Sequence, residues 1–221
     1  MAATGLLAFF AGLGTKPATR KPAVGHNLLV GYWRLLHQRI IQYSMLCAYL
    51  SALPFSLSIS FYPLLLADFG YGEGASGILL ALRALGAIAA GLIAARFVRT
   101  GPETLWPVLC GVAVAAAVGL VPTVDHAAPI GFWMLLVGFG SGAMTLYFQI
   151  TIAEASRREE RGSALALGGL GWGISHLSTP LVMGFLADRY GIVAGFYAIG
   201  AFALACTLVI GVVRGWAFRR P

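Results

Sequence analysis

An arginine and a histidine, Arg83 and His176, lie within long apolar stretches of this sequence, where such side chains are unusual. A buried guanidinium can bind an anion or pair with a carboxylate, and a histidine can bind substrate or relay protons near neutral pH. Each also has a plainer explanation. Arg83, about two turns from the expected end of its stretch, could reach lipid headgroups, and His176 could bond to another helix or a backbone carbonyl. With Ser141 and Gln149 from a third stretch, these residues form our predicted substrate-binding set.

Other chemistry finds little support in the sequence. The three cysteines, Cys47, Cys110 and Cys206, each lie inside an apolar run at spacings that suit no metal, so we expect them to be small packing residues. We predict no metal, no cofactor and no nucleic-acid partner. The carboxylates all lie at the ends of apolar stretches or between them: Asp68, Glu73, Glu103, Asp125, Glu154, Glu159, Glu160 and Asp188.

The composition indicates that lipid is the solvent. Of 221 residues, 59% are hydrophobic and 10% are charged, whereas soluble domains carry about 25% charged residues. Six runs approach or exceed the roughly 20 apolar residues that cross a bilayer. They are 41–66, 76–98, 105–121, 130–152, 163–187 and 192–213. Helices are expected, because each segment must satisfy its own backbone hydrogen bonds in lipid.

The basic residues predict the orientation of these spans. All fifteen lysines and arginines except Arg83 and Arg189 fall before the first span or after the second, fourth and sixth. Cytoplasmic connections carry the excess of basic residues in membrane proteins. We therefore predict a multi-pass protein of the plasma (inner) membrane with both termini in the cytoplasm.

A short internal repeat relates the two halves of the chain. The segment GLIAARF at 91–97 recurs as GFLADRY at 184–190, which is 93 residues and three spans later. Three is an odd number, so the two copies would face opposite sides of the membrane. This predicts an all-α integral membrane fold of six helices arranged as a 3+3 inverted repeat.

These segments resemble the signature of the major facilitator superfamily, which reads roughly Gly-x-Leu-Ala-Asp-Arg-x-Gly-Arg-Arg. Gly91, Ala94, Arg96 and Arg99 fit it, with Ala95 in place of the acidic residue. The second copy keeps Asp188, Arg189 and Gly191. The resemblance implies that the gating-loop residues are Gly91, Arg96, Arg99, Asp188 and Arg189.

The resemblance also implies an organisation for the whole chain, as the C-terminal six-helix half of such a transporter. Residues 1–40 would be the end of a preceding helix and a basic cytoplasmic loop, 41–213 the six-helix bundle, and 214–221 a cytoplasmic tail. The spans at 41–66 and 130–152 would line the central cavity. The partners would be the lipid bilayer, a small-molecule substrate, and an N-terminal six-helix half or a second copy.

The expected function is therefore secondary active transport of a small molecule, such as drug or metabolite efflux, by alternating access. Two alternatives stay open. One is a membrane subunit that does not transport. The other is a rhomboid-like intramembrane serine protease, because Gly140-Ser141-Gly142 could hold a nucleophile with His176 as its base, although Phe139 replaces a glycine that the motif requires. Separately, Gly169 and Gly173 form a Gly-x-x-x-Gly motif, which predicts close packing with another helix.

Overall fold

The computed structural model describes residues 28–219, and all regular secondary structure in that range is helical. The α-helices are α2 (Leu28–Leu36), α3 (Arg39–Asp68), α4 (Glu73–Ile93), α5 (Trp106–Leu120), α6 (Ala127–Ala155), α7 (Arg161–Tyr190) and α8 (Ile192–Ala217). Two short 3-10 helices follow α4 and α5, η1 (Ala94–Arg96) and η2 (Val121–Thr123). The chain divides into two compact units, Met1–Gly31 and Tyr32–Pro221, and the second contains α3 to α8. The predicted end of a preceding helix lies outside the described residues.

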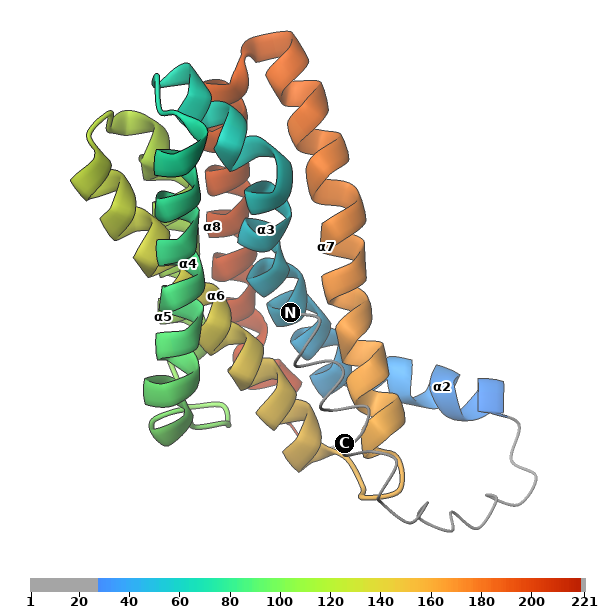
Figure 1. Cartoon of the computed structure of the whole chain (residues 1–221). Helices are drawn as coiled ribbons and strands as arrows, with labels where there is room; N and C mark the ends of the chain where they lie inside the picture. Colours follow the sequence, from blue (N-terminus) through green and yellow to red (C-terminus); the bar gives the residue numbers. More distant parts are fainter. Residues whose placement is uncertain (1–27, 220–221) are drawn as a thin grey trace, which may run out of the picture. The chain divides into compact units, whose positions relative to one another are not determined.

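Within the second unit, α3 to α8 run alternately up and down through the bundle (Figure 1). One end of the bundle gathers nearly all of the described arginines, and we call it the basic end. They are Arg34, Arg39, Arg96, Arg99, Arg157, Arg158, Arg161, Arg214 and Arg219. Arg189 lies at the opposite end, where α7 turns into α8. The basic residues are therefore concentrated at one end of the bundle, as the sequence predicted.

Five of the described helices are long and apolar enough to cross a membrane. They are α3, α4, α5 together with η2 (Trp106–Thr123), α6 and α8. The remaining long helix, α7, has the 30 residues of α3 but is less apolar. Its middle carries the polar residues Ser175, His176, Ser178 and Thr179. At 1.5 Å per residue, α7 is about 45 Å long, which exceeds the hydrocarbon thickness of a bilayer.

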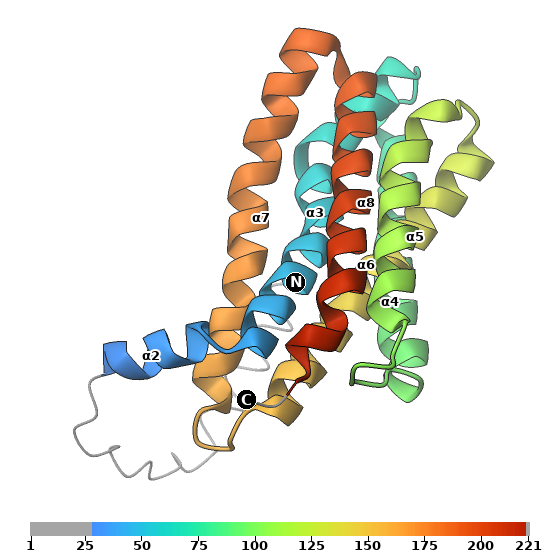
Figure 2. The ribbon, with the colours of Figure 1, turned by 180° about the vertical axis from the view of Figure 1, so that it is seen from behind.

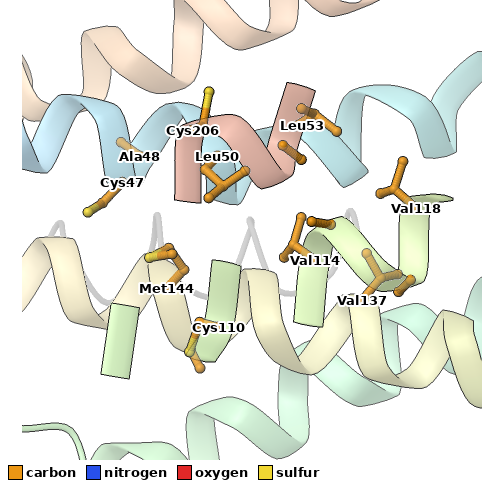
Figure 3. Packing of buried hydrophobic residues seen from close by; sticks show 14 of the residues in the cluster. Cys47, Ala48, Leu50, Leu53, Cys110, Val114, Val118, Val137, Met144 and Cys206 are labelled. Carbon is orange, nitrogen blue, oxygen red and sulfur yellow. The ribbon is translucent and has the colours of Figure 1, made fainter. Parts of the chain in front are cut away.

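The helices pack in pairs that draw on both halves of the sequence. The most extensive contacts join α3 to α7, α4 to α6 and α5 to α8, and α3 also packs against α6 (Figure 2). Cys47, Cys110 and Cys206 are free and buried in the core, near Leu50 and Met144 (Figure 3). Their predicted role as small packing residues is confirmed.

Glycines set how closely these pairs approach. A Cβ atom on Gly138 of α6 would overlap the backbone oxygen of Arg83 on α4, and one on Gly171 of α7 would overlap that of Met45 on α3. Among the described residues, the packing predicted for Gly169 and Gly173 is not found, because a Cβ at either would meet nothing within 4 Å. The glycine spacing marks a smooth helix face but does not specify whether another helix covers it.

Candidate functional site

Arg83 lies at the centre of α4, ten residues from each end of the helix. α4 begins at Glu73, three residues before the predicted start of the span, so Arg83 is about 15 Å along the axis from either end of the helix. The half-buried guanidinium lies over the ring of Phe55 on α3, with 5.2 Å from its carbon to the ring centroid. Its Nε is buried and has no hydrogen-bond partner in the described part of the chain.

His176 lies at the centre of α7 and stacks on Trp172, one turn earlier, with ring centroids 4.2 Å apart. Its Nδ1 is 3.0 Å from the carbonyl oxygen of Trp172, so Nδ1 carries a proton and donates it to that oxygen. The backbone-carbonyl alternative is therefore correct for one ring nitrogen. The other, Nε2, is buried without a partner among residues 28–219. In the neutral tautomer it is a free acceptor.

Phe55 joins these two residues into one group. Its ring centroid is 5.3 Å from that of His176 and 5.5 Å from that of Trp172, while Arg83 covers it from α4. We call Arg83, Phe55, Trp172 and His176 the mid-helix cluster, because all four lie within about two turns of the middle of α4, α3 or α7. Sequence reasoning predicted Arg83 and His176 but missed the two aromatic residues that connect them.

The positive charge in the cluster has no carboxylate beside it. The ion pairs among residues 28–219 are Arg34 with Glu160 and the exposed pair of Asp125 with His126. A guanidinium over an aromatic face gains about 0.5–2 kcal/mol, which is less than the cost of holding a charge in the middle of a membrane. The cluster therefore favours a further anionic partner for Arg83.

A cavity of about 770 Å³ lies between α6 and α7 and shares Trp172 with the mid-helix cluster. Its size is within the usual range for small-molecule sites. Gln149, predicted as a binding residue, is exposed and lines it. Gly169 forms part of the wall, in agreement with the open space that a Cβ there would meet among the described residues. The lining residues are Thr145, Phe148, Gln149, Ile150, Ala153, Leu165, Gly169 and Trp172.

Ser141 lies apart from this arrangement. It is buried, does not line the α6–α7 cavity, and donates its hydroxyl to the carbonyl oxygen of Gly138 in its own helix at 3.1 Å. No hydrogen bond joins Ser141 to His176 within the described residues. Its contact with a substrate stays a prediction.

The predicted gating-loop residues divide between the two ends of the bundle. Gly91, Arg96 and Arg99 are exposed at the basic end, and Asp188 and Arg189 are exposed at the opposite end. None of the four charged residues forms an ion pair with another described residue. These side chains are free to contact something outside residues 28–219.

Polar contacts at the basic end tie the helix connections together. Thr100, between α4 and α5, donates its hydroxyl to Glu154 of α6. Arg214 of α8 donates to the carbonyl oxygen of Thr104 at 2.8 Å. These contacts hold the α4–α5 connection against α6 and α8.

The spacing of the short internal repeat could have linked Arg83 to His176. The separation of 93 residues that relates GLIAARF to GFLADRY also relates Arg83 to His176, and Phe55 to Phe148. Phe55 belongs to the mid-helix cluster and Phe148 lines the neighbouring cavity. Two of the predicted binding residues are thus related by the same separation as the short repeat.

A bundle of long apolar helices with a cavity and unpaired polar groups near its middle is typical of an integral membrane protein. The family model of the Major Facilitator Superfamily matches residues 44–221, from the first turns of α3 onward, and the chain belongs to that family. Members are secondary transporters and not enzymes, which excludes the protease alternative. No curated protein matches the chain.

Proposed function

We propose that this chain provides a six-helix unit that moves a small organic molecule across the membrane by alternating access. The observation that carries this is the shared position of Trp172, which lines the α6–α7 cavity and stacks on His176 in the mid-helix cluster. A ligand in the cavity would then contact a ring coupled through Phe55 to Arg83. Transporter sites lie near the bilayer midplane, where these residues would fall.

The proposal includes α7 as a sixth span. Its polar side chains find partners inside the protein, as Ser178 does with the hydroxyl of Tyr49 on α3 at 3.0 Å, and Ser175 with Thr179 at 3.4 Å. Such pairing reduces the cost of placing polar groups in lipid. The exposed residues Leu177, Leu181 and Phe185 supply an apolar surface to the bilayer. With α7 spanning, both termini would lie on the side of the basic end, which the positive-inside rule assigns to the cytoplasm.

The helix contacts support the 3+3 inverted repeat. In such a repeat, α3 corresponds to α6, α4 to α7 and α5 to α8. The α3–α7 pair then corresponds to the α6–α4 pair, and both pairs are among the most extensive contacts. The α5–α8 and α3–α6 pairs map onto themselves under the same correspondence. The correspondence of Arg83 with His176 fits this symmetry.

The chemistry of the site favours an organic anion with a flat apolar part. Arg83 has no carboxylate partner, and the rings of Phe55 and Trp172 offer surfaces on which a flat group can stack. The amide of Gln149 and the free Nε2 of His176 supply polar contacts. Efflux of a drug or metabolite of this type from the cytoplasm across the plasma (inner) membrane is the direction that we propose.

Alternating access requires a second bundle to close the cavity in turn from each side. We propose that this is an N-terminal six-helix half or a second copy. The open faces of Gly169 and Gly173 leave room for a close approach beside the cavity. Arg96 and Arg99 at one end, and Asp188 and Arg189 at the other, would contact the ends of that bundle.

The test is transport of fluorescent aromatic carboxylates in inside-out membrane vesicles that contain the full chain. Wild type is compared with Arg83→Ala and His176→Ala, and with Phe185→Leu, which alters an exposed residue of α7 outside the cluster. Losing a hydrogen bond to a charged group costs about 1.5–3 kcal/mol, so we expect affinity to fall about 10- to 100-fold in Arg83→Ala. Unchanged affinity and rate in both alanine variants would remove these residues from the site. Absence of flux for every probe would favour the non-transporting subunit.

A further inference from the structure

A second cavity, of about 360 Å³, lies at the basic end, where α3 begins and α8 ends. Its lining combines a histidine and two arginines with no carboxylate. The lining residues are His37, Gln38, Arg39, Ile40, Ala217 and Arg219. None of them lines the cavity between α6 and α7, so this second cavity is a separate feature.

Both arginines of this cavity keep their charge available. All eight aspartates and glutamates of the chain lie within the described residues, and neither Arg39 nor Arg219 pairs with one. The guanidinium carbon of Arg39 is 5.0 Å from the ring centroid of Trp216, and this contact restrains the side chain without neutralising it. The cavity therefore has a net positive charge.

The position of the cavity along α8 matches the boundary between lipid and water. Val212, one turn before Trp216, is 83% exposed, and such an apolar surface belongs in the hydrocarbon region. Trp216 is the type of residue that is enriched at membrane interfaces, and Arg219 follows it by less than a turn. These residues would place the cavity at the depth of the lipid headgroups.

We propose that this cavity binds a phosphate group, as in the headgroup of an anionic phospholipid. A guanidinium matches the geometry of phosphate oxygens with two parallel hydrogen bonds, and two guanidiniums can hold one phosphate from both sides. Basic pockets between spanning helices bind such headgroups on the cytoplasmic side of membranes. Bound there, the lipid links the start of α3 to the end of α8. Free phosphate shares the same chemistry, so the experiment separates the two sources.

The test uses the purified, delipidated full chain and native mass spectrometry with phosphatidylglycerol or phosphatidylcholine. The variants are Arg39→Gln, Arg219→Gln and the two combined. The matched control is Arg157→Gln with Arg158→Gln, which removes the same charge from exposed positions at the same end of the bundle. In a parallel arm, inorganic phosphate is tested for displacing phosphatidylglycerol and for raising the unfolding temperature of the lipid-free chain.

We expect wild type to retain phosphatidylglycerol in preference to phosphatidylcholine. Each lost arginine should weaken that binding about fivefold, the equivalent of about 1 kcal/mol per basic residue, and the control pair should change it less than twofold. The single variants keep the comparison valid if the combined variant does not fold. Displacement by phosphate that depends on Arg39 and Arg219 would identify soluble phosphate as the source, and its absence would identify the lipid. Equal retention of both lipids, or an equal loss in the control pair, would overturn the proposal.

Discussion

Replacing Phe55 with leucine should disconnect the mid-helix cluster while keeping an apolar side chain on α3. Phe55 makes three contacts that depend on its ring, one with the Arg83 guanidinium and one each with the His176 and Trp172 rings. A cation–π contact contributes about 0.5–2 kcal/mol and an aromatic pair about 0.5–1.5 kcal/mol. Because Phe55 is 37% exposed, we take values near the lower end, and expect a loss of about 2 kcal/mol of unfolding free energy.

The assay is thermal unfolding of the full chain in mild detergent, which needs no knowledge of the substrate. For a chain of this size, 2 kcal/mol corresponds to a fall of about 4–8 °C in the unfolding temperature. Phe185→Leu is the matched control, since Phe185 is 66% exposed on α7 and should shift the temperature little. Arg83→Gln should cost less in the Phe55→Leu background than in wild type, by about 0.5–1 kcal/mol. Equal losses for both phenylalanine variants, with no such coupling, would refute the cluster as an interacting unit.

Three further outcomes follow from the packing and the cavity. Gly171→Ala should lower the unfolding free energy by about 1–3 kcal/mol, because the new methyl group would overlap the Met45 backbone. Its control, Gly173→Ala, should stay within about 0.5 kcal/mol of wild type in the same unfolding measurement, because its methyl group would meet nothing within 4 Å among the described residues. Gln149→Ala should raise the KM of transport about tenfold with no change in the unfolding temperature, because its amide is exposed in the cavity. Arg34→Ala breaks the pair with Glu160, in which Arg34 is 61% exposed, so it should cost less than about 1 kcal/mol in thermal unfolding at low salt and still less at high salt.

The positions of the helices were predictable because long apolar runs alternate with short connections along the sequence. Each of the six predicted apolar runs corresponds to one of α3 to α8. The ends differ by a few residues, as in α6, which begins at Ala127 rather than at 130, because a helix can continue beyond the apolar run that identifies it. In α4, the earlier start at Glu73 places Arg83 at the centre of the helix.

The site was predictable only in part. Arg83 and His176 stand out because a polar side chain in an apolar run is unusual. Phe55 and Trp172 do not stand out, since aromatic residues are common in spanning helices and only the packing of α3 against α7 brings them together. For the same reason, Gly169 could be interpreted as a packing residue although it faces a cavity.

The central claim is that α3 to α8 all cross the membrane, with the basic end in the cytoplasm. It is tested most directly by single-cysteine labelling of intact cells with a membrane-impermeant maleimide, in a background without the three native cysteines. The positions lie at four successive helix junctions: Gly101 between α4 and α5, Ala127 at the start of α6, Arg158 between α6 and α7, and Arg189 at the end of α7. We predict labelling of Ala127→Cys and Arg189→Cys, and labelling of Gly101→Cys and Arg158→Cys only after permeabilisation. Equal labelling at Arg158→Cys and Arg189→Cys before permeabilisation would show that α7 does not span, and would contradict the account.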